Sequence, residues 1–383
     1  MRQEEAAYWI ALAHLPRWGH LKINSLIVKF FKDYSISIEE FFSLSESEWR
    51  SSYELDIKQI TDLQQAKTEL ASNAFLAESY FNQGFEIIPI TSPEYSGTLK
   101  QNLKTAHAPA VLYVKGNKKI LQEKSVAIVG SRDASELALQ FTDNIAKLAS
   151  RDYKVVVSGF AKGVDKQALD SAVHYKGQSI IVLPQGIMTF GTGFKTYYNQ
   201  ILDGDVLVLS TFFPKAPWKT ELAMARNPII YGLADEIFVA ESAEKGGTWS
   251  GVVDGLRKQR KIFVRKSEVG ERNANELLIA RGAIAVDFHG VEVMPTNTTE
   301  NQVGTSRAQE PDSQESLIEK IREALNSRPL SAKDLLLKLN LDWSASKMQK
   351  FLSELDYVEP FTVKRTKLYR VKNAKEPIQI GLF

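Results

Sequence analysis

The segment 126–132 of this 383-residue chain joins a buried strand pattern to residues that can hold a phosphate. An apolar, β-branched run over 126–129 continues directly into Gly130, Ser131 and Arg132, and a helical pattern follows. Glycine allows a tight turn, serine and backbone amides donate hydrogen bonds to phosphate oxygens, and arginine pairs with phosphate through two bonds. The segment matches neither the GxGxxG nor the GxxxxGK[ST] fingerprint. The alternative is therefore a structural turn between strand and helix, with Arg132 on the surface.

A second turn of similar composition follows the apolar run 155–157. It contributes Ser158, Gly159, Lys162 and Gly163. We interpret Asp165, which comes next, as the cap of a helix over 166–176 in preference to a catalytic group. Two glycines, a serine and a lysine at the end of a neighbouring strand predict a second anion cradle beside the first.

Two more polar turns complete the set. One contains Arg226 and Asn227, and the other, which opens a helical pattern, contains Gly246, Gly247 and Thr248. Because the carboxyl ends of parallel strands meet at one edge of a sheet, we expect all four turns to converge there. Together they favour a site for a phosphate-rich ligand over a purely structural role.

The chain offers little for catalysis. It contains no Cys, and we find no HExxH, no GxSxG and no pair of His at the spacing of metal ligands. Asp165 and Glu241 are the carboxylates nearest the predicted site, and neither is evidently placed for acid–base work. We therefore predict a binding protein that is not an enzyme, with no catalytic residue, no metal and no cofactor.

Composition and charge are those of an ordinary globular protein. The chain has 48 Lys plus Arg and 46 Asp plus Glu, a formal net charge of +2, of which +4 falls on the segment from Ser313 onward and about −2 on the rest. It has no apolar run of the roughly 18 residues needed to span a membrane, and its acidic N-terminus does not resemble a signal peptide. The absence of Cys fits a reducing compartment. We predict a cytoplasmic protein without a membrane partner.

The elements that would position these turns lie between residues 101 and 289. Strand candidates are 111–114, 126–129, 155–157, 180–183, 206–209, 237–239, 262–264 and 283–286, and helix candidates include 135–150, 166–176, 248–259 and 273–281. Strands that alternate with helices of about 10 to 15 residues predict an α/β fold with a doubly wound, mostly parallel sheet. Continuous apolar strands agree, because such strands are buried on both faces.

Two further zones flank this α/β region. Residues 1–99 are rich in helical patterns, including one long predicted helix over 62–80, and the α/β domain is placed at 100–294. Residues 295–314 have almost no large apolar side chains and predict a flexible linker. Residues 315–372 then show three helical segments and a hairpin, the order of a winged helix, and 373–383 form a tail. Basic residues on the predicted wing, Lys364, Arg365 and Lys367, could contact DNA, although a solvated or protein-docking face is the alternative.

The motifs VAIVGSR, VVVSGFAKGVD, ARNPIIYGL, VAESAEKGGTWSG and GAIAV occur in this order. As a set they resemble the bacterial DNA-processing protein A family, also called Smf. The flanking zones are similar to the sterile-alpha-motif-like and winged-helix domains of that family. The sequence departs from the family pattern in four places: Leu169 replaces His, Gly191-Thr192 replaces Tyr-Pro, Thr211 replaces Glu, and Pro228 replaces the second Arg of RNR. The chain is therefore identified as a divergent member.

The resemblance implies an extended Rossmann-like domain that binds single-stranded DNA at its strand ends. Such a protein protects incoming DNA in natural transformation of competent cells, assists loading of the recombinase RecA in DNA recombination, and forms a homodimer. Carried over by position, the DNA site comprises Gly130, Ser131, Arg132, Ser158, Gly159, Lys162, Gly163, Arg226, Asn227, Gly246, Gly247 and Thr248. The alternative is a small-nucleotide-binding sensor or nucleotide-cleaving enzyme on the same fold.

The last five residues, Gln379-Ile380-Gly381-Leu382-Phe383, resemble the peptide with which bacterial polymerases and repair proteins bind the DNA sliding clamp. An extended tail could seat Leu382 and Phe383 in an apolar groove while Gln379 bonds to its rim. Packing of the tail on its own domain is the alternative interpretation.

Overall fold

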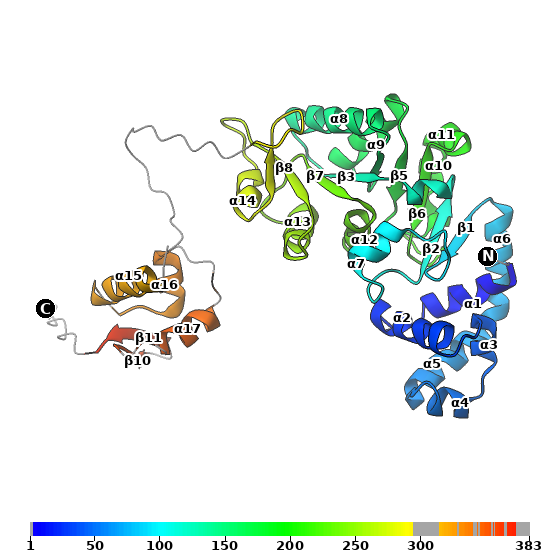
Figure 1. Ribbon diagram of the computed structural model, residues 1–383, viewed down its shortest axis with the longest axis horizontal. Coiled ribbons are helices and arrows are strands. Elements are labelled where there is room, and N and C mark those ends of the chain that lie inside the picture. The colour runs from blue at the N-terminus through cyan, green and yellow to red at the C-terminus, as the bar shows by residue number, and fades with distance from the viewer. Residues whose placement is uncertain are drawn as a thin grey trace, which may run out of the picture. The chain divides into compact units, whose positions relative to one another are not determined.

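The structure is a computed structural model that describes residues 3–293, 314–327, 329–339, 343, 345–353, 355, 357–363 and 366–372 (Figure 1). The chain divides into two compact units, Met1–Thr296 and Asn297–Phe383. Over the described ranges, none of the helices combines the length and the apolarity that a membrane span requires. The separate N-terminal domain over 1–99 stays a prediction, since its helices belong to the first unit.

A nine-stranded sheet lies at the centre of the first unit. Its strands are β1 (Glu86–Pro89), β2 (Val111–Lys115), β3 (Ser125–Val129), β4 (Val155–Ser158), β5 (Ser179–Val182), β6 (Val206–Ser210), β7 (Glu236–Val239), β8 (Ile262–Arg265) and β9 (Ile284–Val286). Their order is β1-β2-β6-β5-β4-β3-β7-β8-β9, parallel from β6 to β9 and antiparallel at β1 and β2. All eight predicted strands are confirmed, and the mostly parallel α/β sheet with them. Strand β1 was not predicted.

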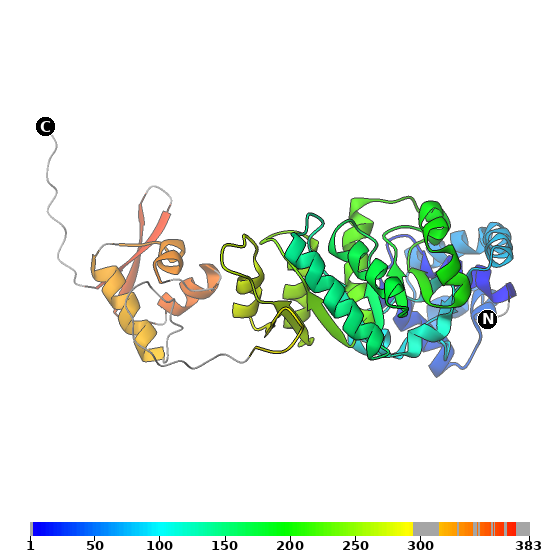
Figure 2. The same ribbon diagram turned by 90° about the horizontal axis from the view of Figure 1, so that it is seen from above.

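Helices cover both faces of this sheet, as a doubly wound fold requires. Helices α8 (Glu136–Arg151) and α9 (Val164–His174) lie on one face, and α7 (Gly97–Leu103), α12 (Thr220–Leu233) and α13 (Gly247–Arg257) on the other (Figures 1 and 2). The alternating residues of β3 show how the sequence produces this arrangement. Val126 and Ile128 belong to the apolar core with α8 and α9, whereas Ala127 and Val129 belong to the core on the opposite face.

The remaining helices of this unit are α1 (Gln3–Ala13), α2 (His20–Val28), α3 (Ile38–Ser43), α4 (Glu46–Ser51), α5 (Ile57–Thr68), α6 (Leu70–Asn82), α10 (Gly191–Thr196), α11 (Tyr198–Asp203) and α14 (Asn275–Ala280), with a π-helical turn at Lys29–Asp33 and 3-10 turns at Lys118–Gln122 and Ile187–Thr189. Ser37, Ser45 and Asp56 form capping boxes that start α3, α4 and α5. The single helix predicted over 62–80 is wrong, because the chain breaks at Glu69 into α5 and α6.

The N-terminal helices contact the sheet through His14, which directly follows α1. Its Nε2 lies 2.9 Å from the hydroxyl of Tyr113, a buried residue of β2, and the two rings are stacked. Phe213 contacts the same imidazole edge-on. Burial, with a smaller contribution from nearby His20, lowers the His14 pKa from 6.5 to about 4.

Acidification is therefore expected to destabilise this contact. His14 binds a proton more readily in the unfolded chain, so stability is complete above pH 6.5 and is lost as the pH falls toward 4. Because partial exposure of the ring weakens the effect, we expect the free energy of unfolding to fall by about 2 kcal/mol over this range. Denaturant unfolding at several pH values measures it. His14→Phe should make stability less dependent on pH, whereas the control His174→Phe, at an exposed position, should leave the dependence as in the wild type. If stability of His14→Phe varies with pH as in the wild type, His14 is not the group responsible.

The second unit has helices α15 (Gln314–Ser327), α16 (Ala332–Lys338) and α17 (Ala345–Ser353), then strands β10 (Val358–Val363) and β11 (Thr366–Val371), which pair antiparallel. Its apolar core includes Ile321, Leu335, Met348 and Tyr369. Ser331 and Asp334 form a capping interaction before α16. The predicted order of three helices and a hairpin is therefore observed.

The winged-helix assignment of this unit stays a prediction. Lys367 is exposed on β11. The other two predicted wing residues, Lys364 and Arg365, lie outside the described residues, as do the clamp-binding tail residues Gln379, Leu382 and Phe383 and nearly all of the predicted linker.

Candidate phosphate-binding site

The centre of the sheet contains a topological switch point. From β3 the chain proceeds through β4, β5 and β6 in one direction, and later through β7, β8 and β9 in the other. The loops that follow β3 and β7 therefore diverge at the carboxyl ends of these two strands. This is the position where ligands bind in open α/β sheets. A cavity of about 370 Å³ lies there, and we call it the phosphate groove. Its lining includes Gly130, Ser131, Arg132, Ala161, Asp165, Thr220, Met224, Arg226, Asn227, Tyr231, Lys245, Gly246, Gly247 and Thr248.

Eight of the predicted site residues thus lie together in one groove. Lys162 and Gly163 line an adjoining open hollow of about 510 Å³, which shares Arg132 with the groove. Ser158 and Gly159 line neither. The hydroxyl of buried Ser158 donates to the carbonyl of Ile128 across 2.8 Å, so this residue stabilises the turn from inside the sheet. The prediction that Ser158 lines the site is wrong.

Direct backbone contacts join the first turn to the others. The Ser131 amide donates to the Glu241 carbonyl at 2.9 Å, and the Thr248 hydroxyl donates to the Gly130 carbonyl at 3.0 Å. A Cβ added to Gly130 would lie 2.6 Å from Cγ2 of Val164. Gly163 has a φ of +84°, and a Cβ there would overlap the Ser131 carbonyl. These glycines are needed because the turns approach one another at backbone distance.

Two helices begin at the groove without a side-chain cap. The N-caps of α9 and α13 are Gly163 and Gly246, and neither receives a capping hydrogen bond from a side chain among the described residues. Helix α8 differs, because the Ser135 hydroxyl accepts the Ala138 amide. In α9 the Val164 amide donates to the Ser131 carbonyl at 3.2 Å and the Lys166 amide to the Ala161 carbonyl at 3.0 Å. The uncapped amides that favour an anion at this position are therefore those of α13, together with the positive ends of the two helix dipoles.

Arg226 occupies the base of the groove and is 4% exposed. We predicted it in a polar turn, which is wrong, because it lies inside α12. Its Nη1 is 3.6 Å from Oδ2 of Asp165, while Nε and Nη1 have no hydrogen-bond partner among the described residues. Burial lowers the pKa of this guanidinium, and the Asp165 charge opposes that shift. The groove thus contains a desolvated cation with unused donors.

Asp165 is also misassigned by the sequence. It lies within α9, whose cap is Gly163, so it does not cap the helix. It contacts Arg226, and burial nevertheless raises its pKa above the ordinary value. Gly159 makes this pair possible, since a Cβ at that position would overlap Nη1 of Arg226 and Oδ2 of Asp165. Sequence reasoning missed this pair because the two residues are far apart in the chain. It also did not name Tyr231 and Lys245 as site residues, although they lie within the motifs ARNPIIYGL and VAESAEKGGTWSG.

The family model described as DNA recombination-mediator protein A matches residues 86–294. The chain belongs to this family. Its sequence is 29% identical over 212 residues to DNA processing protein DprA of Bacillus subtilis, covering 54% of this chain and 70% of that relative. It is 32% identical over 157 residues to DprA of Streptococcus pneumoniae, covering 41% of this chain and 55% of that relative. The predicted family resemblance is confirmed.

The solved structure of DprA from Streptococcus pneumoniae has the same fold. It aligns with 74% of this chain and 94% of its own length, with a TM-score of 0.54 and 24% sequence identity. Family membership gives this chain a role in DNA processing and recombination. The matched region contains every strand of the sheet and the whole phosphate groove.

Proposed function

We propose that this chain binds single-stranded DNA along the phosphate groove and is not an enzyme. In this role it protects incoming DNA and assists RecA loading in natural transformation and recombination, as a cytoplasmic homodimer. The observation that carries the DNA-binding proposal is Arg226, whose buried guanidinium has donors that the protein itself does not satisfy.

An unpaired buried donor costs about 1 to 3 kcal/mol, and more when the group is charged. A phosphate oxygen in the groove would remove that cost by accepting from Arg226. The uncapped amides that begin α13 can donate to the same phosphate. Arg132 and Lys245, both exposed at the rim, supply further positive charge against the single carboxylate of Asp165.

The adjoining hollow favours a strand over a mononucleotide. Arg132 borders both the groove and the hollow, and Lys162 and Lys166 also line the hollow. Lys162 pairs loosely with Asp133 across 3.3 Å, and both side chains are more than 80% exposed, so a phosphate can replace that partner at little cost. The groove and the adjoining hollow, each lined by basic side chains, are suited to bind successive phosphates of one DNA strand.

The carboxylates near the groove support binding without cleavage. Asp165 is buried against Arg226. Oε2 of Glu241 accepts the Ser135 hydroxyl at 2.5 Å and the Ser135 amide at 3.2 Å. Both groups are therefore engaged in contacts that hold the site, and neither stands free to move a proton.

Arg132→Ala tests the proposal. Wild-type protein should bind a fluorescent single-stranded oligonucleotide with an affinity that falls steeply with salt. The variant should bind about tenfold more weakly, because it lacks one charge-assisted phosphate contact. The slope of log affinity against log salt concentration should be shallower by about 0.7. Arg151→Ala is the matched control, since that side chain is 70% exposed and pairs with Asp152 at the far end of α8. Absence of salt-sensitive binding by the wild type would refute the function, and equal binding by Arg132→Ala would refute the site.

Trp218 offers a base-stacking surface beside the groove. It is 52% exposed and lies two residues before Thr220, which lines the groove. Since stacking of one base contributes about 1 to 3 kcal/mol, Trp218→Ala should weaken oligonucleotide binding about tenfold without changing its salt slope. Phe75→Ala, at an aromatic position on α6 that is 74% exposed, is the control. Equal losses in both variants would contradict a stacking role for Trp218.

The partner contacts outside the groove belong to the same proposal. The wing residues Lys364, Arg365 and Lys367 would add a DNA contact, and Gln379, Leu382 and Phe383 would bind the sliding clamp. A pull-down with the purified clamp should retain the full chain and lose a chain that lacks Leu382 and Phe383. Equal retention would exclude the tail as the binding segment.

A further inference from the structure

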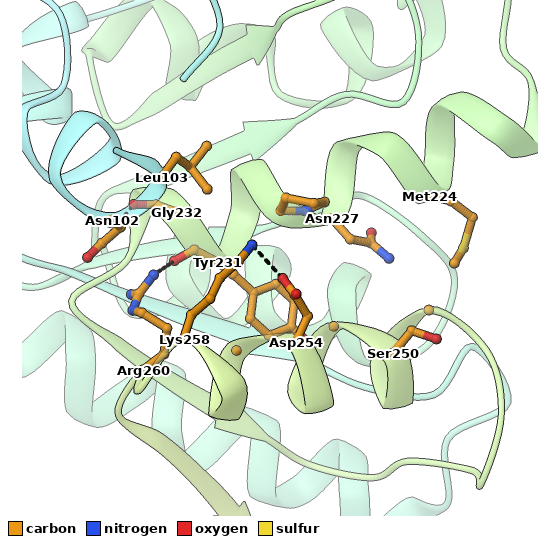
Figure 3. A pocket seen from close by; sticks show the side chains of 14 residues that line it. Asn102, Leu103, Met224, Asn227, Tyr231, Gly232, Ser250, Asp254, Lys258 and Arg260 are labelled. Atoms are coloured by element: carbon orange, nitrogen blue, oxygen red, sulfur yellow. Dashed lines mark hydrogen bonds and ion pairs between the residues drawn. The ribbon is translucent and has the colours of Figure 1, made fainter. Parts of the chain in front are cut away.

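A second cavity, of about 160 Å³, lies beside the phosphate groove between α7, α12 and α13 (Figure 3). Leu103 of α7 and Pro228 and Tyr231 of α12 form its apolar walls. The two cavities adjoin each other, because both are lined by Met224, Asn227, Tyr231 and Gly247. In Figure 3, Met224 and Asn227 lie at one end of the cavity, and Lys258 and Arg260 at the other.

The cavity exists because α13 presents glycine backbone on this side. Gly247, Gly251 and Gly255 line it at intervals of one helical turn. A Cβ on Gly251 would lie 2.8 Å from the Tyr231 hydroxyl, so the Tyr231 ring lies directly against the α13 backbone. The cavity is the space that remains beside this contact, lined by Tyr231 and by the glycine backbone.

The polar groups are distributed unequally around this space. At the far end, Lys258 and Asp254 form an ion pair of 2.7 Å, and Arg260 donates to the Tyr231 carbonyl at 2.8 Å. At the end shared with the groove, the Asn227 side chain makes no hydrogen bond to any residue that the structure describes, although it is half-buried. Its amide offers a donor and an acceptor, the pair of groups that reads the edge of a nucleobase.

We propose that this cavity takes one pyrimidine base of the strand whose phosphates lie in the groove. The inference rests on the proposed function and adds a base preference to it. The cavity is comparable in volume to the engineered cavity of about 150 Å³ that binds benzene, so it suits one six-membered ring better than a fused purine. The base stacks on Tyr231, and its edge bonds to Asn227.

Ser250→Phe provides the test in the full-length protein. Ser250 is an exposed residue of α13 that lines the cavity, so an aromatic side chain there can fill the space without disturbing the core. We expect oligo(dT) to bind the variant about tenfold more weakly, the stacking contribution of one base. Binding of oligo(dA) and of a strand of abasic nucleotides should be unchanged. Ser79→Phe, the same substitution at an exposed position on α6, should alter none of the three affinities.

Each outcome is decisive. Equal binding of oligo(dT) by wild type and Ser250→Phe overturns the inference, as does an equal loss for oligo(dA), which would remove the pyrimidine preference. If the wild type binds none of the strands with salt sensitivity, the proposed function itself fails and the inference fails with it. A thermal unfolding midpoint equal to that of the wild type confirms that the variant folds. Photocrosslinking of 5-iododeoxyuridine strands should label peptides from α12 or α13, and labelling confined to other elements contradicts the proposal.

Discussion

Replacing Arg226 with methionine and Asp165 with asparagine should lower the affinity for single-stranded DNA about 100-fold, roughly the 3 kcal/mol of two charge-assisted bonds. The same double variant should be as stable as the wild type, or more stable by about 1 kcal/mol, because burial of an incompletely paired ion costs free energy. The two residues stand 3.6 Å apart, and two guanidinium nitrogens have no partner within the described structure. Oligonucleotide titration and denaturant unfolding measure the two effects.

The pH dependence supplies a second readout of the same variant. Burial raises the Asp165 pKa above its ordinary value of 3.8. The folded state therefore binds a proton at Asp165 more tightly than the unfolded chain does. The stability that this proton contributes is lost as the pH rises through the raised pKa of the folded state. The advantage of the double variant over the wild type should grow as the pH increases from 3.8. A variant that binds DNA normally, or that unfolds much more readily at neutral pH, would contradict the assignment.

Gly159→Ala should destabilise the protein by about 2 to 3 kcal/mol and reduce DNA binding more than tenfold. The added methyl would overlap the guanidinium of Arg226 and the carboxylate of Asp165, both of which are held by surrounding core. The φ of Gly159 is not among the positive values, so the backbone itself accepts alanine and the effect comes from the displaced pair.

Gly191→Ala is the control for this change. Gly191 begins α10, and no described atom lies within 4 Å of an added Cβ. Its free energy of unfolding should stay within about 0.5 kcal/mol of the wild type. If Gly159→Ala behaves like this control, Arg226 is free to move and the buried pair does not shape the groove.

Much of the fold was predictable because its strands are continuous apolar runs followed by glycine turns. The same signal placed Gly130 and Gly246 at the site. Glycine is needed at Gly130 because Val164 and the Glu241 carbonyl approach it closely, and at Gly246 because its φ is +99°. Strand β1 escaped prediction because its apolar run, Ile87-Ile88, is only two residues long and ends at Pro89. The break at Glu69 escaped because neither glycine nor proline marks it.

The prediction failed where contacts distant in sequence determine the structure. Pro228 made the preceding Arg226 and Asn227 look like a turn, yet it lies inside the 14-residue helix α12, which packs on the sheet. The role of Asp165 depends on Arg226, and that of Gly159 on both. Only the order of strands brings these residues together, and local patterns do not specify that order.

The strand order also has a consequence during synthesis of the chain. Strand β3 pairs with β4 on one side and with β7 on the other, and β7 ends 110 residues after β3. At about 5 to 20 residues per second, the second partner emerges roughly 5 to 20 seconds after β3. For that interval the nascent chain exposes the unpaired edge of a strand whose residues are all buried in the folded protein, and such an edge can pair with other chains. Only after α13 has left the ribosome can the complete groove form.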